Sequence, residues 1–272
     1  MTRKKFIVLS AVVSALIIAI PFVCNESLSE VYYSISTDKV SFPVKIAFFS
    51  DLHSTLYGAG MSELVDSADR FAPDAVIFGG DLFDFRWGEE NSVTFVKKLV
   101  AKYPCFYSVG NHEFHNGLQE EELIKSEMSK LGVIVLDGGF SDISANGSTI
   151  RIHGIDGGDY TDQLENCISG ISDDLYSILI NHYPYQYPWL SLENFDLILS
   201  GHAHGGQWRF PPFINGIYAP GEGILPKYAG GEYLENGTRM IVSRGLQRCL
   251  RDFIIPRIFN RPEAVYITIE PQ

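Results

Sequence analysis

Five short apolar runs in this chain each end abruptly in a string of Asp, His or Asn residues. The strings are Asp51-Leu52-His53, Gly80-Asp81-Leu82-Phe83-Asp84, Gly110-Asn111-His112-Glu113, Asn181-His182 and Gly201-His202-Ala203-His204. The runs alternate with segments of helical spacing, which predicts an α/β fold with largely buried sheets. Ligands of open α/β sheets bind beyond the carboxyl ends of the strands, so we expect the five strings to meet along one edge.

The same alternation continues along most of the chain. Strands are predicted at residues 44–49, 75–78, 106–109, 133–136, 149–152, 177–180, 197–199, 240–242 and 265–269, and helices at 61–70, 93–102 and 118–131. The 272 residues suffice for one domain with a substantial core. We therefore predict a single catalytic domain over residues 44–272, preceded by a tether and an edge strand over residues 25–43.

Each string taken alone has an ordinary structural interpretation. Asp51 could cap the next segment, and Gly-Asp and Gly-Asn pairs commonly form turns. A lone histidine is usually a loop residue whose ring nitrogens are hydrogen-bonded. All five in order, each at a strand end, favour a metal site. The residue types suit Mn, Fe or Zn. The two remaining histidines, His115 and His153, are expected to be a loop and a strand residue without a metal role.

In order, the motifs D-x-H, GD-x-x-D, GNHE, a lone His after a strand and GH-x-H resemble the calcineurin-like metallophosphoesterase superfamily. A closer likeness, to the bacterial YkuE/YaeI-like phosphodiesterase branch, is carried by GHAHGGQWRFP, PGEGILPKYAGGEY, VSRGLQR and RPEAVYITIE. The resemblance implies a sandwich of two mixed β-sheets flanked by helices. It covers the chain from about Val44 to the C-terminus.

The resemblance also implies a site for two divalent metal ions. One ion would be held by Asp51, His53, Asp81 and His204, and the second by Asp81, Asn111, His182 and His202. Asp81 and a hydroxide would bridge the pair. His112 would contact the phosphate and stabilise the transition state, and Asp84 would orient His112 from behind.

Elementary charge arguments support this chemistry. Two divalent ions outweigh the charges of Asp51 and Asp81, so the site attracts phosphate although the chain carries a net charge of -12. Such an ion pair also makes hydroxide available near neutral pH. There is no G-x-S-x-G elbow and no P-loop lysine, so direct attack without a covalent phosphoenzyme is expected. The acidic composition argues against nucleic-acid binding.

The substrate is less constrained than the metal site. Arg86, Arg244 and Arg248 are candidates to bind phosphate, although surface or structural pairing explains each equally well. Aromatic residues after His182 and His204 are expected either to line an apolar rim or to pack ordinarily. We expect a phosphodiesterase or pyrophosphatase acting on lipid or cell-envelope phosphates. The alternatives are a phosphomonoesterase or nucleotide hydrolase, or a non-catalytic envelope-binding protein on the same fold.

The N-terminus is basic over residues 2–5 and apolar over residues 6–23, apart from Ser10, Ser14 and Pro21. The apolar run is near the ~20 residues that span a bilayer and exceeds the roughly 7–15 residues of the apolar region of a signal peptide. No clean A-x-A cleavage site follows it. Residues 1–24 are therefore predicted to be an uncleaved membrane anchor with the catalytic domain outside the cytoplasm. A cleaved signal with secretion, and a buried helix, are the alternatives.

Overall fold

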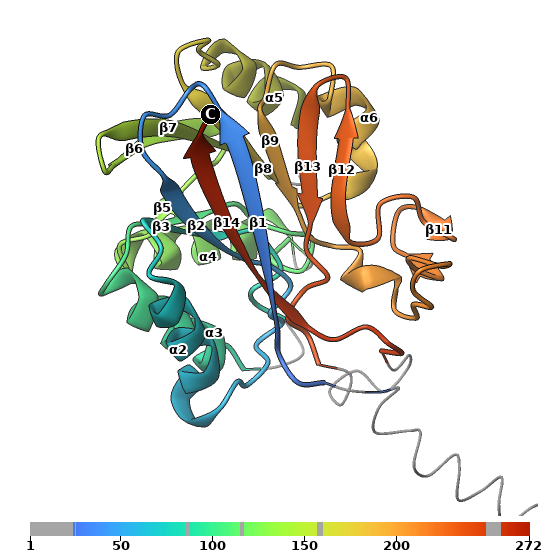
Figure 1. Cartoon of the computed structure of the whole chain (residues 1–272). Helices are drawn as coiled ribbons and strands as arrows, with labels where there is room; N and C mark the ends of the chain where they lie inside the picture. Colours follow the sequence, from blue (N-terminus) through green and yellow to red (C-terminus); the bar gives the residue numbers. More distant parts are fainter. Residues whose placement is uncertain (1–23, 25, 85–87, 115–116, 157–159, 249–256) are drawn as a thin grey trace, which may run out of the picture.

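The protein folds as a sandwich of two facing six-stranded sheets with helices on the outer faces (Figure 1). The computed structural model describes residues 24, 26–84, 88–114, 117–156, 160–248 and 257–272. The predicted sandwich of two mixed sheets flanked by helices is confirmed. The boundaries predicted for the domain and its tether stay predictions.

The first sheet has the strand order β1-β14-β2-β3-β4-β5. Its strands are β1 (Ser29–Thr37), β14 (Glu263–Pro271), β2 (Val44–Phe49), β3 (Ala75–Phe78), β4 (Cys105–Tyr107) and β5 (Ile134–Val135). Strands β2 to β5 are parallel, β14 is antiparallel to β2, and β1 lies at the edge, parallel to β14. The parallel strands therefore deliver their carboxyl ends to one side.

The second sheet has the order β12-β13-β9-β8-β7-β6. Its strands are β12 (Gly231–Glu235), β13 (Thr238–Val242), β9 (Leu197–Ser200), β8 (Tyr176–Asn181), β7 (Ser148–Ile155) and β6 (Gly139–Ala145). The four inner strands are parallel, and both edge strands run antiparallel to their neighbours. A separate two-stranded ribbon, β10 (Tyr218–Ala219) and β11 (Gly223–Ile224), projects from the body of the molecule (Figure 1).

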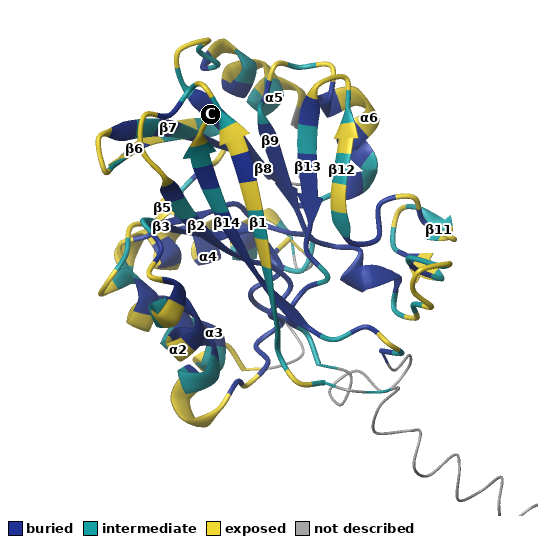
Figure 2. Cartoon of the chain, in the orientation of Figure 1, coloured by how far each residue is buried: buried dark blue, intermediate teal, exposed yellow. Residues whose placement is uncertain are grey.

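The core between the sheets follows from the alternation of side chains along each strand. On β2, Ile46 and Phe48 point into this core, whereas Ala47 and Phe49 point to the opposite face. Ile152 and Ile180 meet them from the second sheet. Strands β8 and β9 are buried along their whole length (Figure 2). Each fully buried aliphatic or phenyl side chain contributes about 1.5–3 kcal/mol, so this apolar contact holds the two sheets in place.

Helices close both outer faces. The helices are η1 (Ala59–Met61), α2 (Ser62–Phe71), α3 (Glu90–Val100), α4 (Leu118–Lys130), α5 (Tyr160–Ser169), η2 (Pro184–Gln186), α6 (Tyr187–Leu190) and η3 (His204–Gly206). Leu64, Phe95 and Met128 of α2, α3 and α4 pack on the first sheet. Cys167 of α5 and Leu190 of α6 pack on the second.

Every strand and helix expected from the sequence overlaps an observed one. The elements that were not predicted are β6, β10, β11, β12, α5, α6, η2 and η3. Strand β6 is a hairpin partner of β7, and its register comes from that pairing because its own sequence lacks a clear apolar alternation. The predicted anchor over residues 1–24 lies almost wholly outside the described residues. Among those that are described, no helix combines the length and apolarity that crossing a membrane requires.

Candidate metal centre

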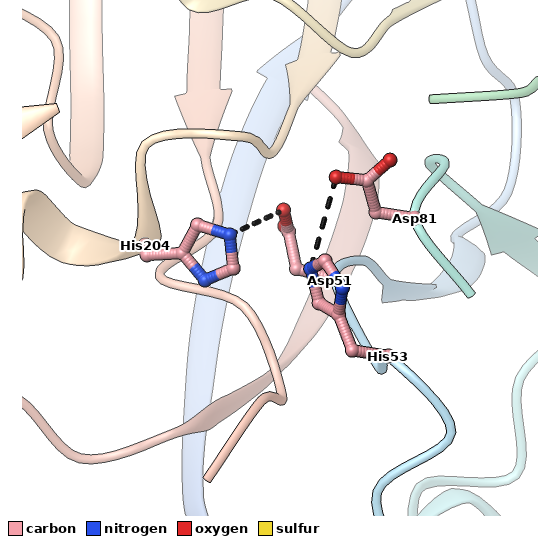
Figure 3. Close-up of side chains that lie close together, drawn as sticks. All are labelled: Asp51, His53, Asp81 and His204. Carbon is pink, nitrogen blue, oxygen red and sulfur yellow. Dashed lines mark ion pairs between the residues drawn. The ribbon is translucent and has the colours of Figure 1, made fainter. Parts of the chain in front are cut away.

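The five polar strings converge at one end of the sandwich, beyond the carboxyl ends of β2, β3 and β4 in the first sheet and of β8 and β9 in the second. The ligand atoms of one group all lie within 4.8 Å of one another. This group is Asp51, His53, Asp81 and His204 (Figure 3). A second group of the same kind is Asp81, His182 and His202. Asp81 belongs to both, so the two groups are adjacent.

Imidazole nitrogens face carboxylate oxygens in both groups. Nε2 of His204 lies 3.5 Å from Oδ1 of Asp51, and Nε2 of His53 lies 3.7 Å from Oδ2 of Asp81 (Figure 3). Nε2 of His182 lies 3.1 Å from the same oxygen of Asp81. All five side chains are at least nine-tenths buried.

The backbone at these positions is strained. Asp51, His53 and Asp81 have φ of 53°, 45° and 52°, and His202 and His204 have φ of 64° and 47°. Non-glycine residues in this left-handed region cost of order 1–3 kcal/mol each and persist where surrounding structure fixes them. Here the loop after β2 is bonded to the loop after β3, with Asp51 N to Gly80 O and His53 N to Asp81 O both at 3.0 Å.

Two motif glycines allow close approach between these loops. A Cβ on Gly110 would lie 2.2 Å from Oδ1 of Asp81, which no side chain can tolerate. Gly80 has φ of 87°, and a Cβ there would lie 2.7 Å from Nδ1 of His182. The glycines of the GD and GN motifs are therefore required by packing around the ligands.

The tautomer of His182 is set by a backbone carbonyl. Its Nδ1 lies 2.7 Å from O of Gly79 and must donate to that carbonyl. Nε2 then carries a lone pair, yet it faces Oδ2 of Asp81 and, at 3.9 Å, Oδ1 of Asp51. A lone pair opposite two carboxylate oxygens is stabilised only by a cation or a proton between them.

The shifted pKa values of the cluster also indicate that its carboxylates favour positive charge beside them. Burial lowers the pKa of His182, but Asp81 and then Asp51 outweigh burial and raise it to about 10. Burial acts to raise the pKa of Asp81, yet the charge of His182 holds it well below its usual range. Burial, and next His182, lower the pKa of His202 to about 3. His202 is therefore neutral, which is the form of histidine that binds metals.

The residues present fit a pair of divalent ions. Oδ1 of Asn111 is buried and makes no hydrogen bond within the described part of the chain, as expected of an oxygen that awaits a ligand bond. The other donors are carboxylate oxygens and imidazole nitrogens. Nitrogen and oxygen donors of this kind suit borderline or hard divalent cations.

Asp84 faces two imidazoles. Its buried Oδ2 lies 3.1 Å from Nδ1 of His53 and 3.5 Å from Nδ1 of His112. The sequence predicted only the contact with His112, and the structure adds the contact with His53. A carboxylate behind Nδ1 fixes which nitrogen carries the proton and turns Nε2 toward the metal or the substrate. His112 remains partly exposed, with 22% of its side chain accessible.

Glu113 was quoted within the GNHE motif, but sequence reasoning gave it no role. Its carboxylate is completely buried and accepts four backbone N–H bonds. The donors are Asp81 at 2.9 Å, Leu82 at 2.7 Å, Phe83 at 3.2 Å and Gly110 at 2.8 Å. One side chain thus ties the loop after β3 to the loop after β4. No sequence pattern reveals backbone partners of this kind.

Two residues near the C-terminus also reach the site. Nδ2 of Asn260 donates to O of His204 at 2.7 Å and to O of Gln207 at 3.2 Å. The buried guanidinium of Arg257 lies 3.5 Å from Nδ1 of His204. Burial, then His53 and Arg257, hold the pKa of His204 well below its usual range. These contacts join segments more than fifty residues apart, so the sequence carried no signal for them.

The arginines proposed for substrate binding have partners within the protein. Nε of Arg244 contacts Oε2 of Glu263 at 2.5 Å, and Nη2 of Arg248 contacts Oε2 of Glu63 at 3.0 Å. Arg86 lies outside the described residues. Their assignment to the substrate therefore stays a prediction.

The aromatic residues after His182 lie beside the second metal group. The ring of Tyr183 lies 5.0 Å from that of His202, and the ring of Tyr185 lies 6.1 Å from it. Trp208 and Phe210, which follow His204, are exposed. The first pair is therefore adjacent to the ligands, and the second pair belongs to the surface.

A family model described as calcineurin-like phosphoesterase matches residues 44–206, which include every ligand described above. The chain belongs to this family. It is 32% identical over 237 residues to the uncharacterised metallophosphoesterase YkuE of Bacillus subtilis, covering 83% of this chain and 79% of that protein. It is 26% identical over 208 residues to phosphodiesterase YaeI of Escherichia coli, covering 75% of each.

Another relative is an uncharacterised metallophosphoesterase of Campylobacter jejuni, 31% identical over 194 residues, which are 66% of this chain. The match spans about half of that relative's length, 51%. Among solved structures, the NAD nucleotidase of Haemophilus influenzae superposes with a TM-score of 0.51 at 15% identity, covering 76% of this chain and 46% of that one. This likeness supports the fold alone. The family membership makes the protein a metal-dependent phosphoester hydrolase.

Proposed function

We propose that this protein is a membrane-anchored phosphodiesterase or pyrophosphatase that hydrolyses lipid or cell-envelope phosphates with two divalent ions. The observation that carries the two-ion part is the pair of ligand groups that share Asp81. Mn, Fe or Zn are the ions that the nitrogen and oxygen donors favour. The predicted ligand Asn111, with its buried and unpaired Oδ1, completes the second group.

The chain's own residues supply orientation and hydrogen bonding. Bound ions would provide a hydroxide nucleophile near neutral pH and neutralise charge on the phosphate. The carboxylate of Asp84 faces Nδ1 of His112 and stabilises the doubly protonated ring, and in that form Nε2 of this partly exposed side chain can donate to the phosphate or the leaving oxygen. At His53 the same carboxylate holds the proton of the neutral ring on Nδ1, which leaves the lone pair of Nε2 for a metal ion. The ring of Tyr183 packs edge to face against that of His202 and helps to hold it in place.

Two observations support the finer parts of this proposal, one bearing on a location at the membrane and the other on a diester substrate. The apolar run of residues 6–23 follows a basic N-terminus, which is typical of an anchor with the catalytic domain outside the cytoplasm. The relative from Escherichia coli is named a phosphodiesterase, which favours a diester.

The test uses the full chain in detergent micelles, stripped of metal and reloaded separately with Mn, Zn, Fe or Mg. Hydrolysis of bis-p-nitrophenyl phosphate and of p-nitrophenyl phosphate is compared, with His112→Ala as the control. We expect metal-dependent cleavage of the diester that the control loses. Preference for the monoester would overturn the diesterase assignment. Bound metal with no turnover of either compound would contradict a general phosphoesterase.

A further inference from the structure

A group of large apolar side chains lies exposed near the metal centre. We name this group the apolar shelf and define it as Phe210, Phe213, Ile224, Leu225 and Phe259. Phe213 is 90% exposed and Ile224 is 79% exposed, the highest values for large apolar side chains among the described residues. Leu225 is 62% exposed. Soluble proteins rarely expose several large apolar side chains close together, so a group of this kind marks a contact surface.

The shelf is built on hydrogen-bonded backbone. N of Arg209 donates to O of Ile258 at 2.9 Å, and this pairing brings the rings of Phe210 and Phe259 to 6.0 Å. N of Leu225 donates to O of Ile217 at 2.8 Å, next to the β10–β11 ribbon that carries Ile224. Figure 1 shows this ribbon projecting outward from the sandwich. The exposed side chains therefore belong to segments that backbone hydrogen bonds hold in position.

The shelf begins beside the point where the N-terminal segment joins the domain. Nε of Arg261 donates to O of Ser27 at 3.0 Å, and its Nη2 donates to O of Leu28 at 2.5 Å. Arg261 follows Phe259 by two residues. The apolar run of the sequence ends at Val23, and the two residues held by Arg261, Ser27 and Leu28, follow it by four and five positions. Fully extended, five residues span at most about 18 Å.

This short connection identifies what covers the shelf. With residues 6–23 in a bilayer, the surface around Ser27 and Leu28 must lie within about 18 Å of that bilayer. Phe259, two residues before Arg261, and Phe210, whose ring meets that of Phe259 edge to face, belong to the shelf. We infer that the apolar shelf is a membrane-contact surface that inserts into the headgroup region of the bilayer holding the anchor.

The inference rests on the membrane-anchor part of the proposed function and has a consequence for its substrate. Asn260, next to Phe259, donates to O of His204, a residue of the first metal group. Apolar faces of peripheral proteins enter the interface by about 5–10 Å. The metal centre would therefore lie close to the headgroup layer, within reach of a phosphate that is still attached to a lipid.

The experiment places a tryptophan on the shelf in the full chain, reconstituted into phosphatidylethanolamine–phosphatidylglycerol vesicles with or without brominated acyl chains. Phe213→Trp is compared with Leu192→Trp, whose site follows α6 and is also well exposed, at 67%. After subtraction of the wild-type signal, we expect bromine to quench the tryptophan at position 213 and to leave the one at position 192 unaffected. Equal quenching of both, or of neither, would overturn the inference. Shielding of position 213 without quenching would assign the shelf to a protein partner or a second copy, and also overturn it.

A second measurement separates failure of the shelf from failure of the proposed function. The same vesicles are assayed with soluble bis-p-nitrophenyl phosphate and with a long-chain lipid phosphodiester. Phe213→Asp and, independently, Ile224→Asp should retain hydrolysis of the soluble diester and lose most hydrolysis of the lipid. If the wild type hydrolyses the soluble diester but the variants match it on the lipid, only the shelf inference fails. If the wild type hydrolyses neither, the proposed function fails, whatever the quenching shows.

Discussion

The two sheets contribute differently to the metal centre. The loops after β2, β3 and β4 of the first sheet carry the carboxylates, and buried charged side chains join them, with Glu113 bonded to four backbone N–H groups. The loops after β8 and β9 of the second sheet carry three imidazoles. Two of these residues are supported by the first sheet, since Nδ1 of His182 donates to O of Gly79 and N of His202 donates to Oδ1 of Asp51 at 2.9 Å.

This asymmetry shows how a two-sheet site is assembled. The first sheet builds a frame that supports itself, and the second sheet adds ligands that are oriented by contact with that frame. We therefore expect changes in the first-sheet loops to affect both metal groups, and changes in the second sheet to have local effects.

The largest effect is expected from Asp81→Asn, because Asp81 belongs to both ligand groups. Losing a residue that merely supports a ligand typically costs about 10–100-fold in metal affinity or activity, and losing a shared ligand should cost more. The bound metal, counted by atomic emission, should fall from two ions to at most one, and diester turnover should be lost. Retention of both ions would show that the remaining ligands bind metal without the shared carboxylate of Asp81.

Glu113→Gln should come next. The amide cannot accept from both pairs of N–H donors, so two buried donors lose their acceptor, at about 1–3 kcal/mol for each one left unpaired. We expect a lower unfolding free energy in urea and weaker binding of metal in titrations. The control Glu165→Gln, on the exposed surface of α5, should change neither quantity. A Glu113→Gln protein with normal stability and normal metal affinity would contradict the view that Glu113 holds the first-sheet loops in place for the ligands.

Asp84→Asn should reduce diester turnover by about 10–100-fold, because the amide no longer fixes the rings of His53 and His112. The double variant with His112→Ala distinguishes the two contacts. If Asp84 acts through His112 alone, adding Asp84→Asn to the His112→Ala variant does not change its metal affinity. A further loss of metal affinity in that background would show that the contact with His53 also matters.

The smallest predicted effect concerns His153, which lies in the second sheet on β7, away from any ligand. Burial, then the charge of Arg151, lower the pKa of this imidazole to about 4, whereas its unfolded value is near 6.5. Below pH 6.5 the unfolded chain binds a proton that the folded chain excludes, so stability falls toward pH 4 and is unaffected above 6.5. His153→Leu should therefore remove about 1 kcal/mol of stability loss between pH 6.5 and 5.5. Urea unfolding at both pH values measures this; an identical change in the wild type and the variant would refute it.

Features that depend on neighbouring residues in the sequence were predicted, whereas features that depend on contacts between distant residues were not. Strands such as β2 and β8 were predicted because their side chains are buried on both faces, which leaves a continuous apolar run. The glycines and ligands that follow them form local motifs, and the structure brings those motifs together. By contrast, Glu113 binds backbone groups that have no sequence signature, and Asn260 reaches His204 across 56 positions. The shelf was anticipated only in part, through Phe210.

The strained backbone of the ligand loops has a consequence for laboratory evolution of this protein. Five ligand residues occupy left-handed conformations that glycine adopts without penalty, Asp51 and Asp81 among them. Replacing such a residue with glycine would relieve strain of order 1–3 kcal/mol while deleting a metal ligand. A selection for heat resistance alone would thus favour inactive variants, since stability and activity compete at the same positions. Directed evolution of this scaffold would need to score turnover in every round.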